Sequence, residues 1–150
     1  MFDLRELYQE RILEHSKRPR YFSMLAEANC WIESYNPRCG DKVTLYLEID
    51  RERIRDIRFQ GAGCPISIAS ASMLTERVHG RTRAEAEALC ESFHHLVTGQ
   101  SQASEVDPEL GDLVGFAGMA AFPVRIKCAT LAWHALRAVL RGAGDNTATT

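Results

Sequence analysis

The tight turn around Cys39, in the stretch SYNPRCGDKV at residues 34–43, places a thiol two positions before the carboxylate of Asp41. Two interpretations fit this pattern. In the first, Gly40 and Asp41 serve the backbone of an ordinary hairpin turn, and the cysteine is incidental. In the second, the thiol and the carboxylate are two ligands of a metal ion whose other ligands lie elsewhere in the chain. The remaining cysteines bear on this choice.

Two further cysteines occupy positions that favour a thiolate. Cys64 stands in GAGCPIS, directly before a predicted helix, where the positive end of the helix dipole and the free N–H groups stabilise negative charge. Cys128 lies in the first turns of the last predicted helix, close after Arg125 and Lys127, whose positive charges have the same effect. The thiolate is the form of cysteine that binds metals and acts as a nucleophile.

Three thiolates and one carboxylate match the ligands that zinc takes in proteins, and the candidates are Cys39, Asp41, Cys64 and Cys128. An iron–sulfur cluster is a second possibility, although clusters are usually held by thiolates alone. Spacing does not decide, because the gaps of 25 and 64 residues match no compact zinc finger and the chain has no Cys-x-x-Cys pair. The residue types alone leave a shared metal site and unrelated roles for these cysteines both open.

The composition limits the function classes. With 150 residues, 45% hydrophobic residues and a net charge of −2, we expect one soluble domain without the basic excess of a nucleic-acid-binding protein. No apolar run approaches the ~20 residues of a membrane span, and the charged N-terminal stretch lacks a signal-peptide core. We therefore predict a cytoplasmic protein that binds neither nucleic acid nor membranes. In that reducing compartment, five cysteines favour metal binding or catalysis over disulfides.

The elements that must position these residues form an α+β domain. Val43, Leu45, Leu47 and Ile49 alternate with polar residues, which predicts a strand with one buried face. Helical spacing, capping residues and turn signals give the remaining elements. We predict a helix at 3–16, strands at 29–36, 42–49 and 53–60, and helices at 65–79, at 82–98, from Asp107 onward and at 124–141. The result is a small three-stranded antiparallel sheet with about five helices in a domain at 1–142, followed by a disordered tail at 143–150.

Three motifs resemble the IscU/NifU superfamily of iron–sulfur scaffold proteins, most closely its SufU branch. They are YNPRCGDKVTLYLEI, FQGAGCPISIASASMLTE and FPVRIKCATLAWHAL, and the resemblance extends over roughly residues 3–141. It implies an IscU/SufU-like fold. It also implies that the four candidate ligands, which are Cys39, Asp41, Cys64 and Cys128, form one metal site.

Departures from the IscU pattern separate the possible functions. IscU scaffolds carry a histidine before the last cysteine, where this chain has Lys127, and an L-P-P-V-K segment, where it has AAFPVRIK. The predicted helix at 82–98 resembles the insertion that marks SufU. The resemblance therefore implies a zinc-dependent sulfurtransferase that takes persulfide sulfur from a SufS-type cysteine desulfurase and serves downstream SUF scaffold proteins. The alternatives are a scaffold that holds a [2Fe-2S] cluster on the same ligands and a binding module with a structural zinc.

Within such a site, we predict Cys39 as the sulfur acceptor. It stands in a turn beside Gly40 and can move at the lowest backbone cost, whereas Cys64 and Cys128 are fixed by helices. Asp41 is a hard ligand among soft ones, which should leave the site open to ligand exchange. Arg125 is expected to act at the site, by pairing with the carboxylate or with a thiolate.

The other cysteines and histidines are expected to be structural. Cys30 and Cys90 are interpreted as small buried hydrophobic residues. His94 and His95 are adjacent on a helix and point about 100° apart, so that both cannot easily face one ion. His15 and His134 are expected to be half-exposed helix residues.

Overall fold

The computed structural model of the protein describes residues 4–37, 40–100 and 108–142. Its elements are α1 (Leu4–Lys17), β1 (Cys30–Asn36), β2 (Asp41–Asp50), β3 (Arg53–Ala62), α2 (Pro65–Val78), α3 (Arg83–Val97), the 3₁₀-helical segment η2 (Pro108–Ala121) and α4 (Pro123–Leu140). This is the predicted α+β order of one helix, three strands and four helical segments. The predicted cap at Asp107 and the predicted tail at 143–150 lie outside the described residues.

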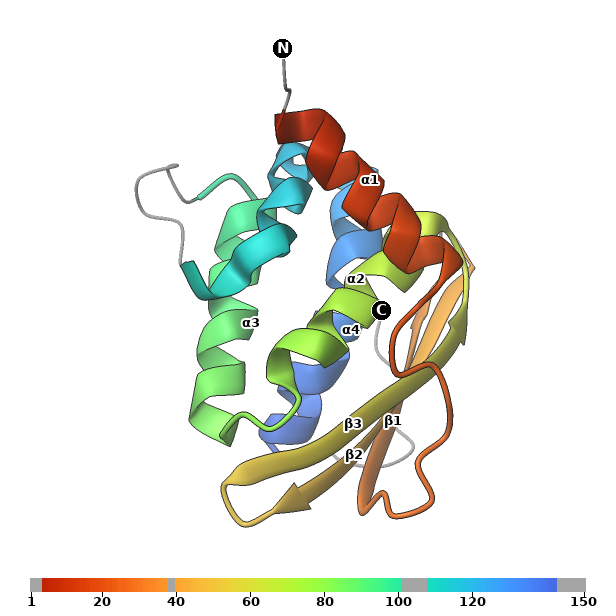
Figure 1. Ribbon diagram of the computed structural model, residues 1–150, viewed down its shortest axis with the longest axis vertical. Helices are drawn as coiled ribbons and strands as arrows, with labels where there is room; N and C mark the ends of the chain where they lie inside the picture. Colours follow the sequence, from red (N-terminus) through yellow and green to blue (C-terminus); the bar gives the residue numbers. More distant parts are fainter. Residues whose placement is uncertain (1–3, 38–39, 101–107, 143–150) are drawn as a thin grey trace.

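The three strands form one antiparallel sheet in the order β1-β2-β3, so that β2 is central (Figure 1). The predicted alternation in β2 is confirmed, because Val43, Leu45, Leu47 and Ile49 are all buried. The same alternation extends back to Asp41, the first residue of the strand, whose carboxylate therefore points to the inner face of the sheet. This register is what brings Asp41 under the helices.

A bulge in β3 interrupts the regular alternation of its inward-facing and outward-facing side chains. The pairing shifts between Glu48 and Ile49, which face Asp56 and Ile54, respectively. The extra residue in β3 turns Ile54 toward the same buried face as Ile57, although the two are three positions apart. Ile57 and Phe59 follow the regular alternation and are also buried.

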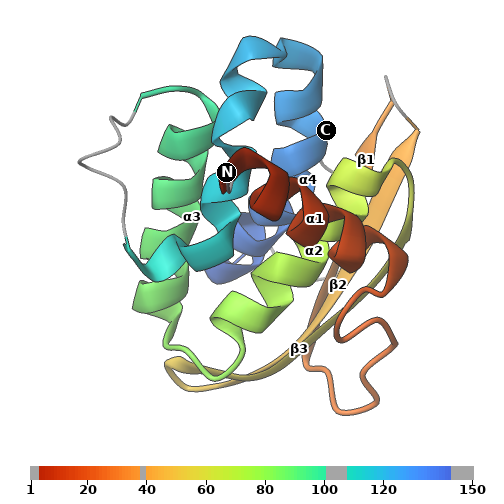
Figure 2. The same ribbon diagram turned by 45° about the horizontal axis from the view of Figure 1, so that its top comes forward.

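The helices cover one face of the sheet in two layers. The first layer is formed by α2 and α4, which contact the strands directly, and α3 and η2 pack behind α4 (Figure 2). Three aromatic rings join the layers: Phe93 stacks on Trp133 at 4.5 Å between ring centroids and meets Phe116 edge to face at 5.6 Å. None of the described helices combines the length and the apolar character that crossing a membrane requires.

The small residues of α2 in the stretch ASAS, at 69–72, allow neighbouring helices to approach closely. All four are buried, and the hydroxyl of Ser70 donates to the carbonyl oxygen of Ala129 at 2.6 Å. The indole Nε1–H of Trp133 donates to the same hydroxyl at 3.0 Å. Both polar partners of Ser70 lie in α4, so this serine fixes α2 against α4.

The contact of α1 with α2 overturns one expectation. His15 is not half-exposed but 1% exposed, with Nδ1 2.7 Å from the hydroxyl of Ser72 and Nε2 3.5 Å from Glu76. Leu13, two positions earlier in α1, is 50% exposed. The physical reason is that Ser72 is small and polar, which gives the imidazole both space and a hydrogen-bond partner at the helix crossing.

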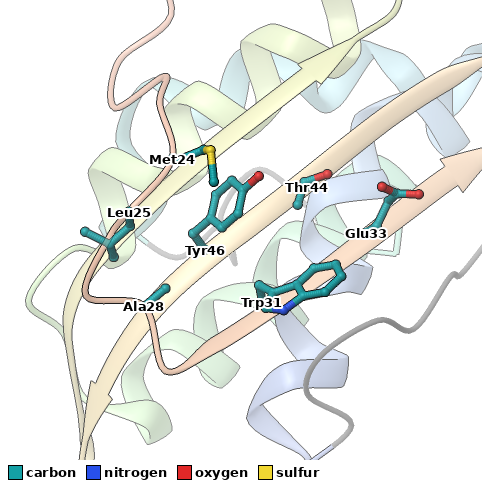
Figure 3. Close-up of a pocket in the computed structure, with 7 residues that line it drawn as sticks. All are labelled: Met24, Leu25, Ala28, Trp31, Glu33, Thr44 and Tyr46. Carbon is teal, nitrogen blue, oxygen red and sulfur yellow. The ribbon is translucent and has the colours of Figure 1, made fainter.

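The outer face of the sheet has no described helix above it. The segment before β1 runs beside this face and, with β1 and β2, borders a shallow pocket of about 390 Å³, which is lined by Met24, Leu25, Ala28, Trp31, Glu33, Thr44 and Tyr46 (Figure 3). Thr44 and Tyr46 point outward, opposite to the inward-facing Asp41. The pocket and the candidate ligands therefore lie on opposite faces of the sheet.

Candidate metal centre

Three of the four predicted ligands meet at one place. The ligand atoms of Asp41, Cys64 and Cys128 all lie within 4.8 Å of one another. They come from the first residue of β2, the residue before α2 and the second turn of α4, respectively. The fourth predicted ligand, Cys39, lies outside the described residues. Its neighbour Gly40 closes the hairpin with φ +73°, and its N–H donates to the carbonyl oxygen of Asn36 at 2.8 Å.

Asp41 is fully buried and is held by the start of α2. The backbone N–H of Cys64 donates to Oδ1 of Asp41 at 2.8 Å, and the Cys64 thiol lies 3.6 Å from Oδ2. Burial by itself raises the pKa of Asp41, but the hydrogen bonds from Cys64, Ser67 and Cys128 outweigh it and hold the pKa below its ordinary value. The carboxylate is therefore ionised at neutral pH, which is the form that binds a cation.

Gly61 and Gly63 let the end of β3 approach β2 closely, and Gly63 makes room for this carboxylate. A Cβ on Gly63 would lie 2.9 Å from both Cα and Cγ of Asp41 and would collide with Oδ1. A Cβ on Gly61 would collide with the backbone carbonyl oxygen of Lys42 and lie 3.2 Å from Cα of Val43. The end of β3 can approach β2 this closely only because both positions lack a side chain.

The two described thiols differ in their surroundings. Cys64 is half-buried and caps α2, and its extended backbone (φ −71°, ψ 157°) precedes Pro65 at the first helical position. Cys128 is fully buried in α4, where its thiol lies 3.8 Å from the carbonyl oxygen of Val124. Both sulfur atoms are thus positioned by helices, one at a helix start and one inside a helix.

Ser67 is a member of the site that the sequence analysis did not single out. It is 1% exposed, its hydroxyl donates to the carbonyl oxygen of Cys128 at 3.2 Å, and it lies 3.8 Å from Sγ of Cys64. The same hydroxyl contributes to the lowered pKa of Asp41. Its position three residues after Cys64, one turn into α2, was the available signal, since residues three apart on a helix share a face.

The other predicted residues lie as follows. Arg125 is exposed, and within the described part of the chain its guanidinium forms no ion pair with Asp41. Cys90 is buried between α3 and α4, where burial raises the pKa of its thiol to about 12. Cys30 is half-buried in β1. Neither Cys30 nor Cys90 belongs to the group around Asp41.

The described donors fit a divalent cation that accepts sulfur and oxygen. Two sulfur atoms and an ionised carboxylate oxygen converge from three elements, and zinc takes these ligand types in tetrahedral sites. At the start of α4, the helix that carries Cys128, Phe122 and Val124 are 60% and 55% exposed. The site has the donors to bind a metal ion that keeps thiols as thiolates.

Comparisons with known proteins give a consistent result. A family model described as the NifU-like N terminal domain matches residues 7–141. The chain is 42% identical over 138 residues to the iron–sulfur cluster assembly scaffold protein IscU of Streptococcus pyogenes serotype M1, covering 92% of this chain and 85% of the relative. It is 37% identical over 145 residues to the zinc-dependent sulfurtransferase SufU of Bacillus subtilis strain 168, covering 96% and 97%.

The fold is also similar to solved structures. A candidate iron–sulfur cluster assembly scaffold protein for the SUF system, from Fervidobacterium islandicum AW-1, superposes with a TM-score of 0.81. That protein is 31% identical, and the match covers 92% of this chain and 99% of the other. A second crystal structure, of a hypothetical protein, gives a TM-score of 0.82 at 42% identity, with 91% and 98% covered.

Proposed function

Because the chain belongs to the NifU-like N-terminal domain family of iron–sulfur cluster assembly proteins, we propose that it is a zinc-dependent sulfur acceptor. It takes persulfide sulfur from a SufS-type cysteine desulfurase. The observation that carries the proposal is the convergence of Asp41, Cys64 and Cys128 within 4.8 Å. Lys127 directly before Cys128, instead of the histidine of IscU scaffolds, favours the sulfurtransferase. The similarity to the Bacillus subtilis sulfurtransferase over 96% of this chain supports it further.

The proposed ligands are Cys39, Asp41, Cys64 and Cys128, and Cys39 is the proposed acceptor. Zinc, when bound, would keep these thiols deprotonated at neutral pH and protect them from oxidation. Cys64 starts α2 and Cys128 is buried in α4, so either would have to move a helix in order to reach a partner. Cys39 precedes Gly40, which is exposed and has open space around it. This difference supports Cys39 as the thiolate that meets the persulfide.

The transfer step is a nucleophilic substitution at sulfur. The Cys39 thiolate attacks the terminal sulfur of the desulfurase persulfide. A new S–S bond forms on Cys39, the S–S bond on the desulfurase breaks, and its electron pair leaves with the desulfurase thiolate. The proton on the terminal sulfur stays with that sulfur, so the step consumes no oxidant or reductant.

The start of α4 offers a surface for the desulfurase. Phe122 and Val124 are exposed apolar side chains, and Arg125 and Lys127 add positive charge within the same two turns. We assign Arg125 to steering the persulfide or the desulfurase to the site, since its guanidinium is exposed and available to a partner. Substituting Arg125 with alanine should reduce desulfurase stimulation and leave zinc content unchanged.

Metal analysis and desulfurase turnover test the function. Protein purified without added metal should be colourless and contain about one zinc per chain; a brown sample with iron would favour the alternative, a scaffold holding a [2Fe-2S] cluster on the same ligands. Adding the protein to its cognate desulfurase should raise alanine production. If alanine production does not change, the sulfur-acceptor role is wrong.

A pair of cysteine variants tests the acceptor. Cys39→Ala should abolish persulfide loading, whereas Cys90→Ala should load normally, because Cys90 is buried with a pKa near 12 and cannot act as a thiolate. Equal loading of the two variants would overturn the assignment of Cys39.

A further inference from the structure

Three histidines gather at the seam between α3 and α4. The ring centroid of His94, in the last turn of α3, lies 6.1 Å from that of His134 in α4 and 6.3 Å from that of His95. His134 follows Cys128 by six residues, which corresponds to a rise of about 9 Å and a rotation of about 240° along an α-helix. His134 therefore points to a different side of α4 from Cys128, the ligand of the Asp41 centre on this helix.

His94 carries an unexplained polar atom. Its Nδ1 is buried and has no hydrogen-bond partner among the described residues. A buried imidazole nitrogen is normally paired, and an orphaned one is a sign of a missing water or ion. His94 therefore has one imidazole nitrogen without a protein partner, in a ring whose centroid lies 6.1 Å from that of His134.

The second imidazole is in the form that binds metals. His134 is exposed at its edge, yet burial of the ring, His94 and Arg137 all lower the pKa of His134 below its ordinary value. The ring is therefore neutral at pH 7 and keeps a free lone pair. Arg137 also repels a cation at this place, so the affinity of any metal here should be lower than at a centre built from thiolates.

The spacing suits one metal ion between the two helices. A metal with two imidazole nitrogens about 2.0–2.1 Å away holds the ring centres roughly 5 to 6.5 Å apart, and the observed 6.1 Å lies in this range. His94 and His95 are neighbours on one helix and point about 100° apart, so the pair across the helices is the better set. Imidazole ligands suit zinc, copper and nickel.

We propose that His94 and His134 form a second metal site, which binds a divalent transition-metal ion such as Zn²⁺ or Ni²⁺ and links α3 to α4. In the described part of the chain, only Asp41, Cys64 and Cys128 already form a set of three converging donors. The new site is thus a two-histidine site that water completes. Glu91, exposed and one helical turn before His94, offers a carboxylate on the same side of α3.

A titration of the protein preloaded with one equivalent of zinc tests the proposal. Isothermal titration with further Zn²⁺ should show a second, weaker equivalent. His94→Gln and His134→Gln should each weaken that second step about tenfold or more, since even an outer-shell partner of a metal typically contributes this much. Tight zinc retained by both variants would show that the fold and the thiolate centre are intact, which separates this test from that of the proposed function.

Matched histidine variants and a direct probe complete the experiment. His79→Gln removes a histidine that bonds Asp56 at 3.1 Å far from the seam, and His95→Gln removes the helix neighbour; both should keep the second step. Ni²⁺ added to the zinc-loaded wild type should broaden the imidazole NMR signals of His94 and His134 and spare those of His15 and His79. A single zinc step in the wild type, or equal losses in the His95 and His134 variants, would overturn the proposal.

Discussion

Gly63→Ala tests whether the close approach of β3 to β2 holds the carboxylate of Asp41 in place. The added Cβ would lie 2.9 Å from Cα and Cγ of Asp41, and ordinary van der Waals contact begins at 3.4 Å. The carboxylate carbon must therefore retreat by at least 0.5 Å, the difference of these two distances. Oδ1, which the Cβ would meet more closely still, must retreat further, and its 2.8 Å hydrogen bond from Cys64 N–H would be lost.

We expect Gly63→Ala to lower the affinity of the site for zinc. A hydrogen bond to a charged group contributes about 1.5–3 kcal/mol, and a misplaced ligand should weaken zinc binding about tenfold or more, or about 1.4 kcal/mol. Competition with a chromophoric zinc chelator measures this directly. Gly118→Ala is the matched control, because its Cβ would meet no atom within 4 Å.

A second measurement separates the clash from a backbone effect. Gly63 has φ +156°, a conformation that favours glycine, so alanine there also destabilises the metal-free fold. Thermal unfolding of the metal-free variant measures this loss of fold stability separately from any change in zinc binding. If Gly63→Ala lowers the melting temperature but binds zinc as tightly as Gly118→Ala, the carboxylate is not held in the way described.

The two buried serines of α2 should respond in opposite ways: Ser67→Ala should weaken zinc binding with a small change in stability, whereas Ser70→Ala should keep zinc affinity. Ser70→Ala leaves the buried indole N–H of Trp133 without its partner and should lower the free energy of unfolding by about 1–3 kcal/mol in urea titrations; the same response from both variants would contradict the assignment. Burial lowers the pKa of His15, so the folded state prefers the neutral ring, and stability should be complete above the ordinary value of 6.5 and fall as the pH drops below it. Urea unfolding at pH 7.5 and at lower pH should show this decrease in the wild type and a smaller one in His15→Gln; an equal decrease would assign it to other groups.

The sequence predicted best where one physical rule acts alone. The alternation in β2 gave its buried face, because neighbouring residues of a strand point to opposite sides of the sheet. The predictions from the sequence failed where a residue far along the chain decides whether a side chain is buried. Hydrophobic periodicity treats His15 as a polar residue and so does not predict its burial. Its burial is favourable only because Ser72, 57 residues later in the chain, is a hydrogen-bond partner. Ile54 faces inward because of a bulge that pairing with β2 creates, which no pattern within β3 contains.

The same distinction between local and long-range signals applies to the residues of the candidate site. Cys64 and Cys128 could be placed at a helix start and in a helix from local signals. Ser67 shares a helix face with Cys64, which is a local signal, but its hydrogen bond to the carbonyl oxygen of Cys128, 61 residues away in α4, has none. The prediction that the ligands converge came from the resemblance of the three motifs to a known family, because spacing alone did not decide whether they share a site.

Asp41 explains why a carboxylate suits this position better than a fourth thiol would. One carboxylate oxygen accepts the Cys64 N–H at the start of α2, where a free donor would otherwise be buried, and the other lies 3.6 Å from the Cys64 sulfur. A thiolate has one acceptor atom, which the helix start and a cation would have to share, whereas the carboxylate offers each of them its own oxygen. The carboxylate therefore joins β2 to α2 before any metal arrives. In the proposed sulfur acceptor, a hard oxygen would also hold zinc less tightly than sulfur does, which would leave the metal open to exchange of its ligands.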